Sequence, residues 1–377
     1  MQCDYYDDGR CRSCRLMGVP YPTQVTDKQD RVSTALAAVA PRLTWAEPMT
    51  GPESGFRNRA KLVVAGAVGD PTLGILDDRG AGVDLQQCGL YVPQVSATFE
   101  VLEDFIADLR LLPYNVPKAR GELKHVLVTG APDGRTMVRF VLRSRQQLDR
   151  IERHVVALQR EIPGLEVVSV NLQPEHKAVI EGAEEIVLTR ATTLPVRLDD
   201  VTLHLGPRSF FQTNTAIAQG LYDQATAWAT ATAPRSALDL YCGVGGFALH
   251  LARAGAQRVT GVETSPDAVD GARRSAADLS TATDVEFVTA DATAYARDLH
   301  ETPDLVVVNP PRRGIGGDLA AWLNESDVPE LIYSSCNVES LARDLAAMPA
   351  LSPVEARLFD MFPQTDHHEV MVRLSRR

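Results

Sequence analysis

From about Ser236 onward, short apolar runs alternate strictly with helical segments, and this alternation constrains the fold more than any other feature of the chain. Such alternation is typical of a parallel sheet, because parallel neighbours need a long, usually helical, connection. We therefore predict an α/β C-terminal domain with a Rossmann-like arrangement. The predicted strands span residues 237–241, 258–262, 285–288, 305–308 and 330–333.

A glycine-rich turn, Cys242-Gly243-Val244-Gly245-Gly246, separates the first predicted strand from a helix expected to begin near Ala248. Glycines at this place let the backbone pass close to a bound cofactor. Glu263 ends the second strand, where a carboxylate suits ribose hydroxyls, and Asp291 follows the third, where it is placed to meet an adenine amino group. Asp239, in the first strand, has the simpler interpretation of a strand-end turn residue.

The glycine turn and the acid fit NAD and S-adenosylmethionine alike, but two details favour S-adenosylmethionine. The spacing is GxGG rather than GxGxxG, so a pyrophosphate is not the expected ligand. The turn Asn309-Pro310-Pro311 also ends a strand, and it offers a side-chain amide and a rigid backbone to a flat substrate. The prolines alone could simply terminate that strand. We favour a methyltransferase over a dehydrogenase.

Cys336 follows the apolar run at 330–333, so it lies at the carboxyl end of a predicted strand, where open α/β sheets bind ligands. This place makes it a candidate nucleophile, although a free cysteine is more often a small buried hydrophobe. Cys242 is the competing thiol. It lies inside the glycine turn, beside the expected cofactor, so we assign it a packing role.

Cysteines also cluster in the first fifteen residues, at Cys3, Cys11 and Cys14, and Cys88 stands alone further on. In a cytoplasmic protein such a cluster indicates a metal site or catalysis more than disulfides. Four thiolates would suit either zinc or a four-iron cluster, and spacing alone does not distinguish them. The alternative is a redox-active or incidental CxxC with an unrelated Cys88.

A region rich in short apolar strands precedes the C-terminal domain, with helical stretches near 95–111 and 146–161, so we predict an α+β middle domain. Arg57, Asn58 and Lys61 precede or begin one of its strands, and cations and amides in such a place suit RNA contacts. A solvated strand edge is an equally good interpretation. The net charge of −11 argues against generic polyanion binding, but not against one basic cleft.

The 377 residues are enough for several cores, and we divide them at residues 1–44, a cysteine-cluster segment; 45–190, the middle domain; and 191–377, the methyltransferase domain. No apolar stretch approaches the length of a membrane span, and the N-terminus has no signal-peptide pattern. We therefore expect a cytoplasmic protein.

Taken together, several motifs resemble the RNA uracil-C5-methyltransferases, and the resemblance covers nearly the whole chain. The motifs are Ser209-Phe210-Phe211-Gln212-Thr213-Asn214, Asp239-Leu240-Tyr241-Cys242-Gly243-Val244-Gly245-Gly246-Phe247, Asn309-Pro310-Pro311-Arg312-Arg313-Gly314 and Ser334-Ser335-Cys336-Asn337. The chain looks closest to the shorter branch, which modifies the uridine called 747 in bacterial 23S ribosomal RNA. A stem-loop of that RNA is the partner that the resemblance implies.

The resemblance also implies roles for individual residues. Cys336 matches the nucleophile that adds to uracil C6, and Glu369 matches the base that removes the C5 proton, although by itself it could be an ordinary acid at a strand start. The N-terminal cysteines and Cys88 match the ligands of a 4Fe-4S cluster. Tyr241 stands where relatives often carry Phe. The implied S-adenosylmethionine-binding residues are Gln212, Tyr241, Gly243, Gly245, Glu263, Asp291 and Asn309.

Three alternatives stay open at this stage. The chain could methylate a tRNA or another ribosomal site, it could be an amino-group methyltransferase of the Asn-Pro-Pro type that needs no covalent thiol, or it could be an inactive RNA-binding scaffold. Gln212 and Asn214 could likewise cap the helix expected near Ala216 rather than serve the cofactor.

Overall fold

The computed structural model describes residues 1–176 and 179–377, and these form two compact units. The first comprises Met1–Met17 and Glu53–Val196, and the second comprises Gly18–Pro52 and Arg197–Arg377. These limits differ from the domain boundaries predicted at residues 44 and 190. The main reason is the segment after the cysteine cluster, which contributes its helix and a short strand to the second unit rather than to a separate N-terminal piece.

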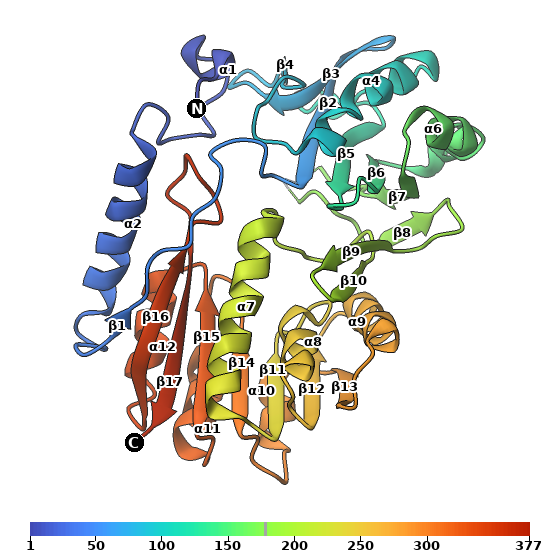
Figure 1. The fold of residues 1–377 in the computed structure, drawn as a ribbon. Helices are drawn as coiled ribbons and strands as arrows, with labels where there is room; N and C mark the ends of the chain where they lie inside the picture. The colour runs from blue at the N-terminus through green and yellow to red at the C-terminus, as the bar shows by residue number, and fades with distance from the viewer. Residues whose placement is uncertain (177–178) are drawn as a thin grey trace. The chain divides into compact units, whose positions relative to one another are not determined.

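The main sheet of the second unit is mostly parallel, as the alternation of strands and helices predicts. Its strands in chain order are β1 (Thr44–Trp45), β11 (Ser236–Leu240), β12 (Arg258–Glu263), β13 (Asp284–Thr289), β14 (Leu305–Val308), β15 (Glu330–Ser335), β16 (Leu351–Phe359) and β17 (Glu369–Arg376). In space the order is β1-β16-β17-β15-β14-β11-β12-β13 (Figure 1). β17 runs antiparallel to both of its neighbours, so its first residue lies at the edge where β15 ends.

Helices connect these strands. They are α2 (Tyr21–Leu36), α7 (Thr215–Thr232), α8 (Gly246–Arg253), α9 (Pro266–Asp278), α10 (Ala292–Arg297), α11 (Gly316–Glu325) and α12 (Val338–Ala346). The central strands are apolar on both faces because helices cover both: every residue of β14, Leu305 to Val308, is buried. One core forms around this strand, and Val32 and Leu36 of α2 belong to it. A short hairpin of β9 (Leu194–Leu198) and β10 (Val201–Leu205) precedes α7 in the chain.

The first unit is α+β, as predicted for the middle of the chain. Its sheet has the order β4-β3-β2-β5-β6-β7-β8, and its pairs are antiparallel apart from β6 with β7, which the helices α5 and α6 connect. Its elements are α1 (Asp4–Asp7), β2 (Arg59–Ala67), β3 (Asp70–Leu76), β4 (Gly82–Asp84), α3 (Pro93–Ser96), α4 (Phe99–Asp108), β5 (Leu123–Gly130), β6 (Thr136–Leu142), the 3-10 turn Arg145–Gln147, α5 (Leu148–Glu152), α6 (Val155–Glu161), β7 (Leu165–Leu172) and β8 (Glu184–Val187).

The fold class predicted from the sequence is therefore confirmed: a Rossmann-like α/β domain follows an α+β region. Within residues 1–176 and 179–377, no helix combines the length and the apolar character needed to cross a membrane.

Candidate active site

A cavity of about 580 Å³ opens in the second unit beyond the carboxyl ends of the central strands. This is the place where open α/β sheets bind ligands, since the connecting loops diverge there. The residues around it come from the glycine turn, the strand ends and the segment before α7. They are Phe210, Phe211, Gln212, Tyr222, Tyr241, Cys242, Gly243, Val244, Gly246, Phe247, Glu263, Thr264, Asp291, Thr293, Asn309, Pro310, Pro311, Arg312, Arg313, Ile315, Cys336 and Glu369.

The turn between β11 and α8 brings the backbone close to this cavity. Tyr241 leaves the strand with a φ of 65°, and Gly245 has a φ of 87°. A Cβ atom on Gly245 would lie 2.7 Å from Cζ of Phe287, so both the backbone angle and the packing require glycine there. The turn could not follow this path with a larger residue at position 245.

Glu263, at the end of β12, holds the same turn from the neighbouring strand. Its carboxylate accepts hydrogen bonds from the backbone N–H groups of Gly243 at 3.3 Å and Ser265 at 2.9 Å. Asp291 also has a structural task, because its Oδ1 accepts from the N–H groups of Thr293 and Ala294 at the start of α10. Both acids line the cavity as well, and their cofactor role stays a prediction.

Asp239 has a use beyond that of a turn residue. It is fully buried, and its Oδ2 accepts a hydrogen bond of 2.9 Å from the N–H of Ala248 in the first turn of α8. Burial is the main reason that its pKa rises to about 8, and the nearby charge of Glu263 adds to the shift. Asp239 therefore ties the strand to the helix on either side of the glycine turn.

Cys336 and Glu369 both line the cavity, from the adjacent strands β15 and β17. The register pairs Ser335 with Val370, which places the thiol directly after one strand close to the carboxylate that begins the other. Burial raises the pKa of the Cys336 thiol and the Glu369 charge raises it further, whereas Arg312 lowers it by charge and by a hydrogen bond. The arrangement brings a thiol, a carboxyl group and a cation together.

Glu369 is 5% exposed, and burial raises its pKa to about 8, against the lowering effect of Arg312. Among the described residues, its buried Oε2 has no hydrogen-bond partner. Buried carboxyl oxygens normally have a partner, so an exception at a cavity wall indicates a functional group. The guanidinium of Arg312 is itself 3.0 Å from Nδ1 of His367.

The Asn-Pro-Pro turn is fixed by a neighbouring loop, since the amide of Asn337 donates to the carbonyl of Arg312 at 3.0 Å. Asn309 lines the cavity at the end of β14. The closeness of Arg312 to Cys336 and Glu369 depends on three separate strand ends, so the sequence does not show it. Phe210, which is 70% exposed at the cavity, received no role there, although two adjacent aromatic residues before a polar stretch are a visible signal.

The polar residues before α7 differ in what they do. Gln212 is buried and lines the cavity, in keeping with the predicted cofactor role. Asn214 caps the helix instead: its Oδ1 accepts from the N–H of Ile217 at 3.4 Å, and its amide donates to the carbonyl of Met361. The capping interpretation is therefore right for Asn214.

The first unit brings the four predicted ligand cysteines near one another. Burial, together with the charges of Cys88, Cys11 and Cys3, raises the pKa of Cys14 to about 11. Such mutual repulsion requires neighbouring thiols. Among the residues that the structure describes, however, no group of three or more His, Cys, Asp or Glu side chains has the arrangement of a metal site. The thiols are gathered, but a cluster at this place stays a prediction.

The candidate RNA-binding residues of this unit differ in exposure. Lys61 is exposed, and Arg57 is half-buried with its Nε donating to the carbonyl of Arg59 at 3.1 Å. Asn58 is only 2% exposed, which weighs against a direct contact with RNA. The role of all three stays a prediction.

Fold and site together define an α/β methyltransferase of the Rossmann-like type. Residues 141–377 match the family model of the tRNA (Uracil-5-)-methyltransferases. The 23S rRNA (uracil(747)-C(5))-methyltransferase RlmC of Halothiobacillus neapolitanus is 45% identical over 380 residues, which cover 100% of both chains. The protein of the same name from Escherichia coli O9:H4 is 44% identical over 375 residues, 99% of each chain. The chain therefore belongs to the tRNA (uracil-5-)-methyltransferase family, as its motifs predict.

A solved structure supports the same assignment. The Pyrococcus abyssi tRNA (uracil-54, C5)-methyltransferase, in complex with S-adenosyl-L-homocysteine, superposes with a TM-score of 0.79. The match covers 96% of this chain and 85% of that one, at 26% sequence identity. The similarity extends over both units of the chain, not the methyltransferase domain alone.

Proposed function

We propose that this protein transfers a methyl group from S-adenosylmethionine to C5 of uridine 747 in 23S ribosomal RNA, in the cytoplasm, through a covalent bond between Cys336 and uracil C6. The observation that carries the proposal is the meeting of Cys336, Glu369 and Arg312 in the cavity that also contains the glycine turn. The choice of uridine is supported by relatives that match over their full length and have this name.

The cofactor end of the cavity has suitable donors and acceptors for S-adenosylmethionine. Glu263 has a carboxylate at the end of β12 for ribose hydroxyls, and Asp291 one at the start of α10 for the adenine amino group. Gly243 and Gly245 keep the backbone close, while Tyr241, Gln212 and Asn309 surround the remaining space. When bound there, S-adenosylmethionine supplies an electrophilic methyl group.

Cys336 performs the first step on the RNA base. Uracil C5 is a weak nucleophile, so the thiolate adds to C6, a carbon–sulfur bond forms, and the π electrons move through C5 toward the C4 oxygen. Arg312 is the cation whose charge and hydrogen bond act on the Cys336 thiol, and it favours the thiolate as well as the developing oxyanion. The electron-rich C5 then takes the methyl group, whose bond to sulfur breaks, and S-adenosylhomocysteine is the leaving group.

Glu369 completes the reaction by removing the C5 proton. The released electron pair re-forms the C5–C6 double bond, and the thiolate leaves. A pKa near 8 suits this task, because a carboxylate of that basicity accepts a proton at neutral pH more readily than an ordinary glutamate. The target base must first leave its stack in the RNA to reach the cavity.

We further propose that Cys3, Cys11, Cys14 and Cys88 hold a 4Fe-4S cluster in the first unit. The donor set fits, since the pKa values of Cys14 and Cys88 are raised by burial and by the neighbouring thiols, so that a cationic centre is needed before the four ionise together. The cluster's chemistry there is structural, as methyl transfer needs no electron. Iron, sulfide and zinc analysis of protein purified without oxygen tests the choice of metal.

The first unit then serves to hold the RNA, with Arg57 and Lys61 as contacts to its backbone. Its partner on this proposal is the 23S stem-loop that carries the target uridine. Arg57→Gln and Lys61→Gln are expected to weaken RNA binding without changing cofactor affinity. Equal RNA affinity of these variants and the native protein would remove this part of the proposal.

The decisive experiment uses 23S stem-loop RNA with 5-fluorouridine at the target, because fluorine cannot leave as a proton does. We expect a protein–RNA adduct that survives denaturation and requires both S-adenosylmethionine and Cys336. Normal methylation by Cys336→Ala would contradict the covalent mechanism and favour an amino-group methyltransferase. Failure to methylate any RNA would indicate an inactive scaffold.

The target site needs a separate experiment. Mapping of 5-methyluridine in ribosomal and transfer RNA, from cells with and without the gene, is expected to show loss at uridine 747 alone. Loss in tRNA instead would make this chain similar in substrate to the Pyrococcus abyssi neighbour.

A further inference from the structure

Helix α2 has a buried face that is polar at its N-terminal end. Gln24, Lys28, Val32 and Leu36 follow one another at intervals of four residues, and all four are buried. The last two pack into the apolar core of the second unit. The first two face the loop between β16 and β17, residues 360–368, which ends directly before Glu369.

The central contact is an ion pair inside the protein. Nζ of Lys28 lies 2.6 Å from Oδ1 of Asp360, with 2% and 0% of the two side chains exposed, and it also donates to the carbonyl of Phe362 at 3.2 Å. Burial lowers the pKa of Lys28, and the charge of Asp360 opposes that effect. A buried pair of this kind is seldom the most stable solution for a core, so its use in fixing one arrangement is the better explanation.

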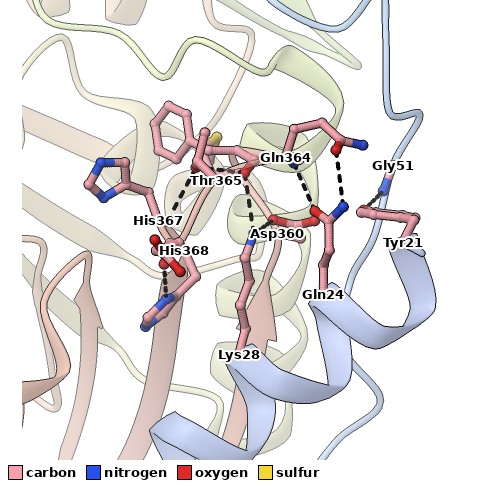
Figure 2. Close-up of polar contacts among 12 residues, drawn as sticks. Tyr21, Gln24, Lys28, Gly51, Asp360, Gln364, Thr365, His367 and His368 are labelled. Carbon is pink, nitrogen blue, oxygen red and sulfur yellow. Dashed lines mark hydrogen bonds and ion pairs between the residues drawn. The ribbon is translucent and has the colours of Figure 1, made fainter. Parts of the chain in front are cut away.

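Two hydrogen bonds between Gln24 and Gln364 hold the same loop (Figure 2). The side chains of Gln24 and Gln364 are joined at 3.0 Å, and the amide oxygen of Gln24 accepts from the backbone N–H of Gln364, also at 3.0 Å. Gln364 has a φ of 66°, a conformation that needs such support in a residue other than glycine. Arg31, one turn further along α2, donates to the carbonyl of Asp366 at 2.6 Å.

From this loop, hydrogen bonds continue to the reacting groups. Oγ1 of Thr365 donates to the carbonyl of Phe362 and accepts from the N–H of His367. The ring of His367 is 3.0 Å from Arg312, the cation that acts on both Cys336 and Glu369. Glu369 comes directly after His368, the last residue of the loop.

We propose that Gln24 and Lys28 are positioning residues for the general base: the polar face of α2 fixes the 360–368 loop so that Glu369 reaches the C5 proton. This inference rests on the proposed role of Glu369. It predicts a specific defect, since a displaced base leaves addition and methyl transfer intact but slows proton removal. The covalent protein–RNA adduct then accumulates on natural uridine, without any fluorine.

The test measures turnover and adduct on natural stem-loop RNA for Lys28→Met, Gln24→Leu and Lys28→Arg. We expect Lys28→Met and Gln24→Leu to lose about 10- to 100-fold in kcat, since small misplacements of a reacting group cost this much. The ratio kcat/KM stays unchanged, because the steps up to methyl transfer are intact. Both variants are expected to accumulate adduct. Lys28→Arg keeps the ion pair, so we expect its turnover to stay close to that of the native protein.

Val32→Ala is the matched control, because this residue is equally buried on the same face but packs against the apolar core. We expect it to lower the melting temperature without adduct accumulation. If Lys28→Met and Gln24→Leu resemble Val32→Ala, with turnover falling only as folded protein is lost, the positioning role is wrong. If Lys28→Met does not fold, Gln24→Leu alone decides between these outcomes.

Glu369→Gln separates this inference from the proposed function on which it rests. Adduct accumulation in Glu369→Gln, without accumulation in the α2 variants, overturns the positioning role and leaves the base assignment intact. Absence of adduct in Glu369→Gln, with turnover retained, overturns the base assignment itself.

Discussion

Glu369 and Cys336 are two acids whose pKa values are raised by burial, and Arg312 opposes the shift at each. Both must lose a proton before they act in the proposed reaction. One guanidinium therefore sets how much of the enzyme is competent at a given pH. The neighbouring Arg313 also lines the cavity, but it is not among the main causes of the pKa shift of either acid.

We predict that turnover at saturating substrate rises with pH, first through about 8 as Glu369 ionises and further at higher pH as Cys336 ionises. Arg312→Gln moves this rise to higher pH, since loss of the cation raises both pKa values, and it lowers the rate at pH 7 by about 10-fold or more. Arg313→Gln is the control and keeps the native profile. Single-turnover rates between pH 6 and pH 10 measure the effect; an unshifted profile in Arg312→Gln would contradict it.

Asp239 gives a prediction about stability rather than rate. Its pKa is about 8 in the folded protein, above the ordinary value near 4, so the folded state holds the proton more tightly. Stability from this group is complete below pH 4 and is lost as pH rises through 8. Asp239→Asn, which still accepts from Ala248, is expected to equal the native protein in stability at pH 4 and exceed it at pH 9.

Tryptophan fluorescence measures this difference in the relevant unit, because Trp45, Trp228 and Trp322 all belong to the second unit. The thermal midpoints of the two proteins are compared at pH 4, 6 and 9. Parallel pH profiles would show that Asp239 is ionised when folded at neutral pH. Glu369 shifts both proteins alike, so it cancels in the comparison.

At the scale of elements, the turn between β11 and α8 depends on glycine for two separable reasons. Gly245 combines a positive φ with a close neighbour, Phe287, whereas Gly255 has a similar φ of 98° and nothing within 4 Å of its Cβ position. An alanine at either position would therefore suffer backbone strain, but only an alanine at position 245 would also collide with Phe287. The two positions form a natural pair for comparison.

We predict that Gly245→Ala destabilises the second unit by about 2 kcal/mol or more and weakens S-adenosylmethionine binding at least 10-fold. Gly255→Ala suffers the strain alone, about 1 kcal/mol, and keeps its cofactor affinity because it lies outside the cavity. Calorimetric titration with S-adenosylhomocysteine and urea unfolding provide the two measurements. Equal losses in both variants would show that packing against Phe287 is unimportant.

The strands of the C-terminal half could be predicted because their signal is local. The predicted strand at 237–241 is β11, which ends one residue earlier since Tyr241 turns to a positive φ. Helix α2 was not predicted, and its composition explains why. Its buried face begins with Gln24 and Lys28, so apolar periodicity, the usual signal of an amphipathic helix, is missing in its first half.

The residues of the site also differ in how well the sequence predicts their place. The glycine turn and Cys336 are visible in the sequence because strand ends determine their place. The closeness of Arg312 to Glu369 is not, since it depends on the antiparallel β17 and on a loop held by distant residues. Asn58 was a candidate for RNA binding because of its neighbours, and only the three-dimensional structure places it inside.

At the scale of the whole molecule, the two proposed sites, the cofactor cavity and the cysteine cluster, belong to different units of the chain. The cavity is lined by residues of the second unit, and the gathered cysteines belong to the first. On the proposed assignment, the metal centre therefore belongs to a different unit from the cofactor. Its effect is expected on the local fold and on RNA binding.

This separation predicts the outcome of Cys88→Ser in the full-length protein. The variant is expected to lose its iron and at least 10-fold in RNA affinity, because the segment 1–17 is short of regular structure and depends on its ligands for order. Its affinity for S-adenosylhomocysteine stays within about 2-fold of the native value, since the second unit is intact. Iron analysis, RNA filter binding and calorimetric titration give the three readouts.

Cys242→Ser is the matched control, because this buried cysteine lies in the cofactor turn of the second unit. It is expected to keep its iron and its RNA affinity, and any loss falls on cofactor binding. A Cys88→Ser protein that retains iron would remove Cys88 from the ligand set. One that loses iron but binds RNA normally would limit the cluster to a role other than RNA recognition, and one that loses cofactor affinity would show that the two units are coupled.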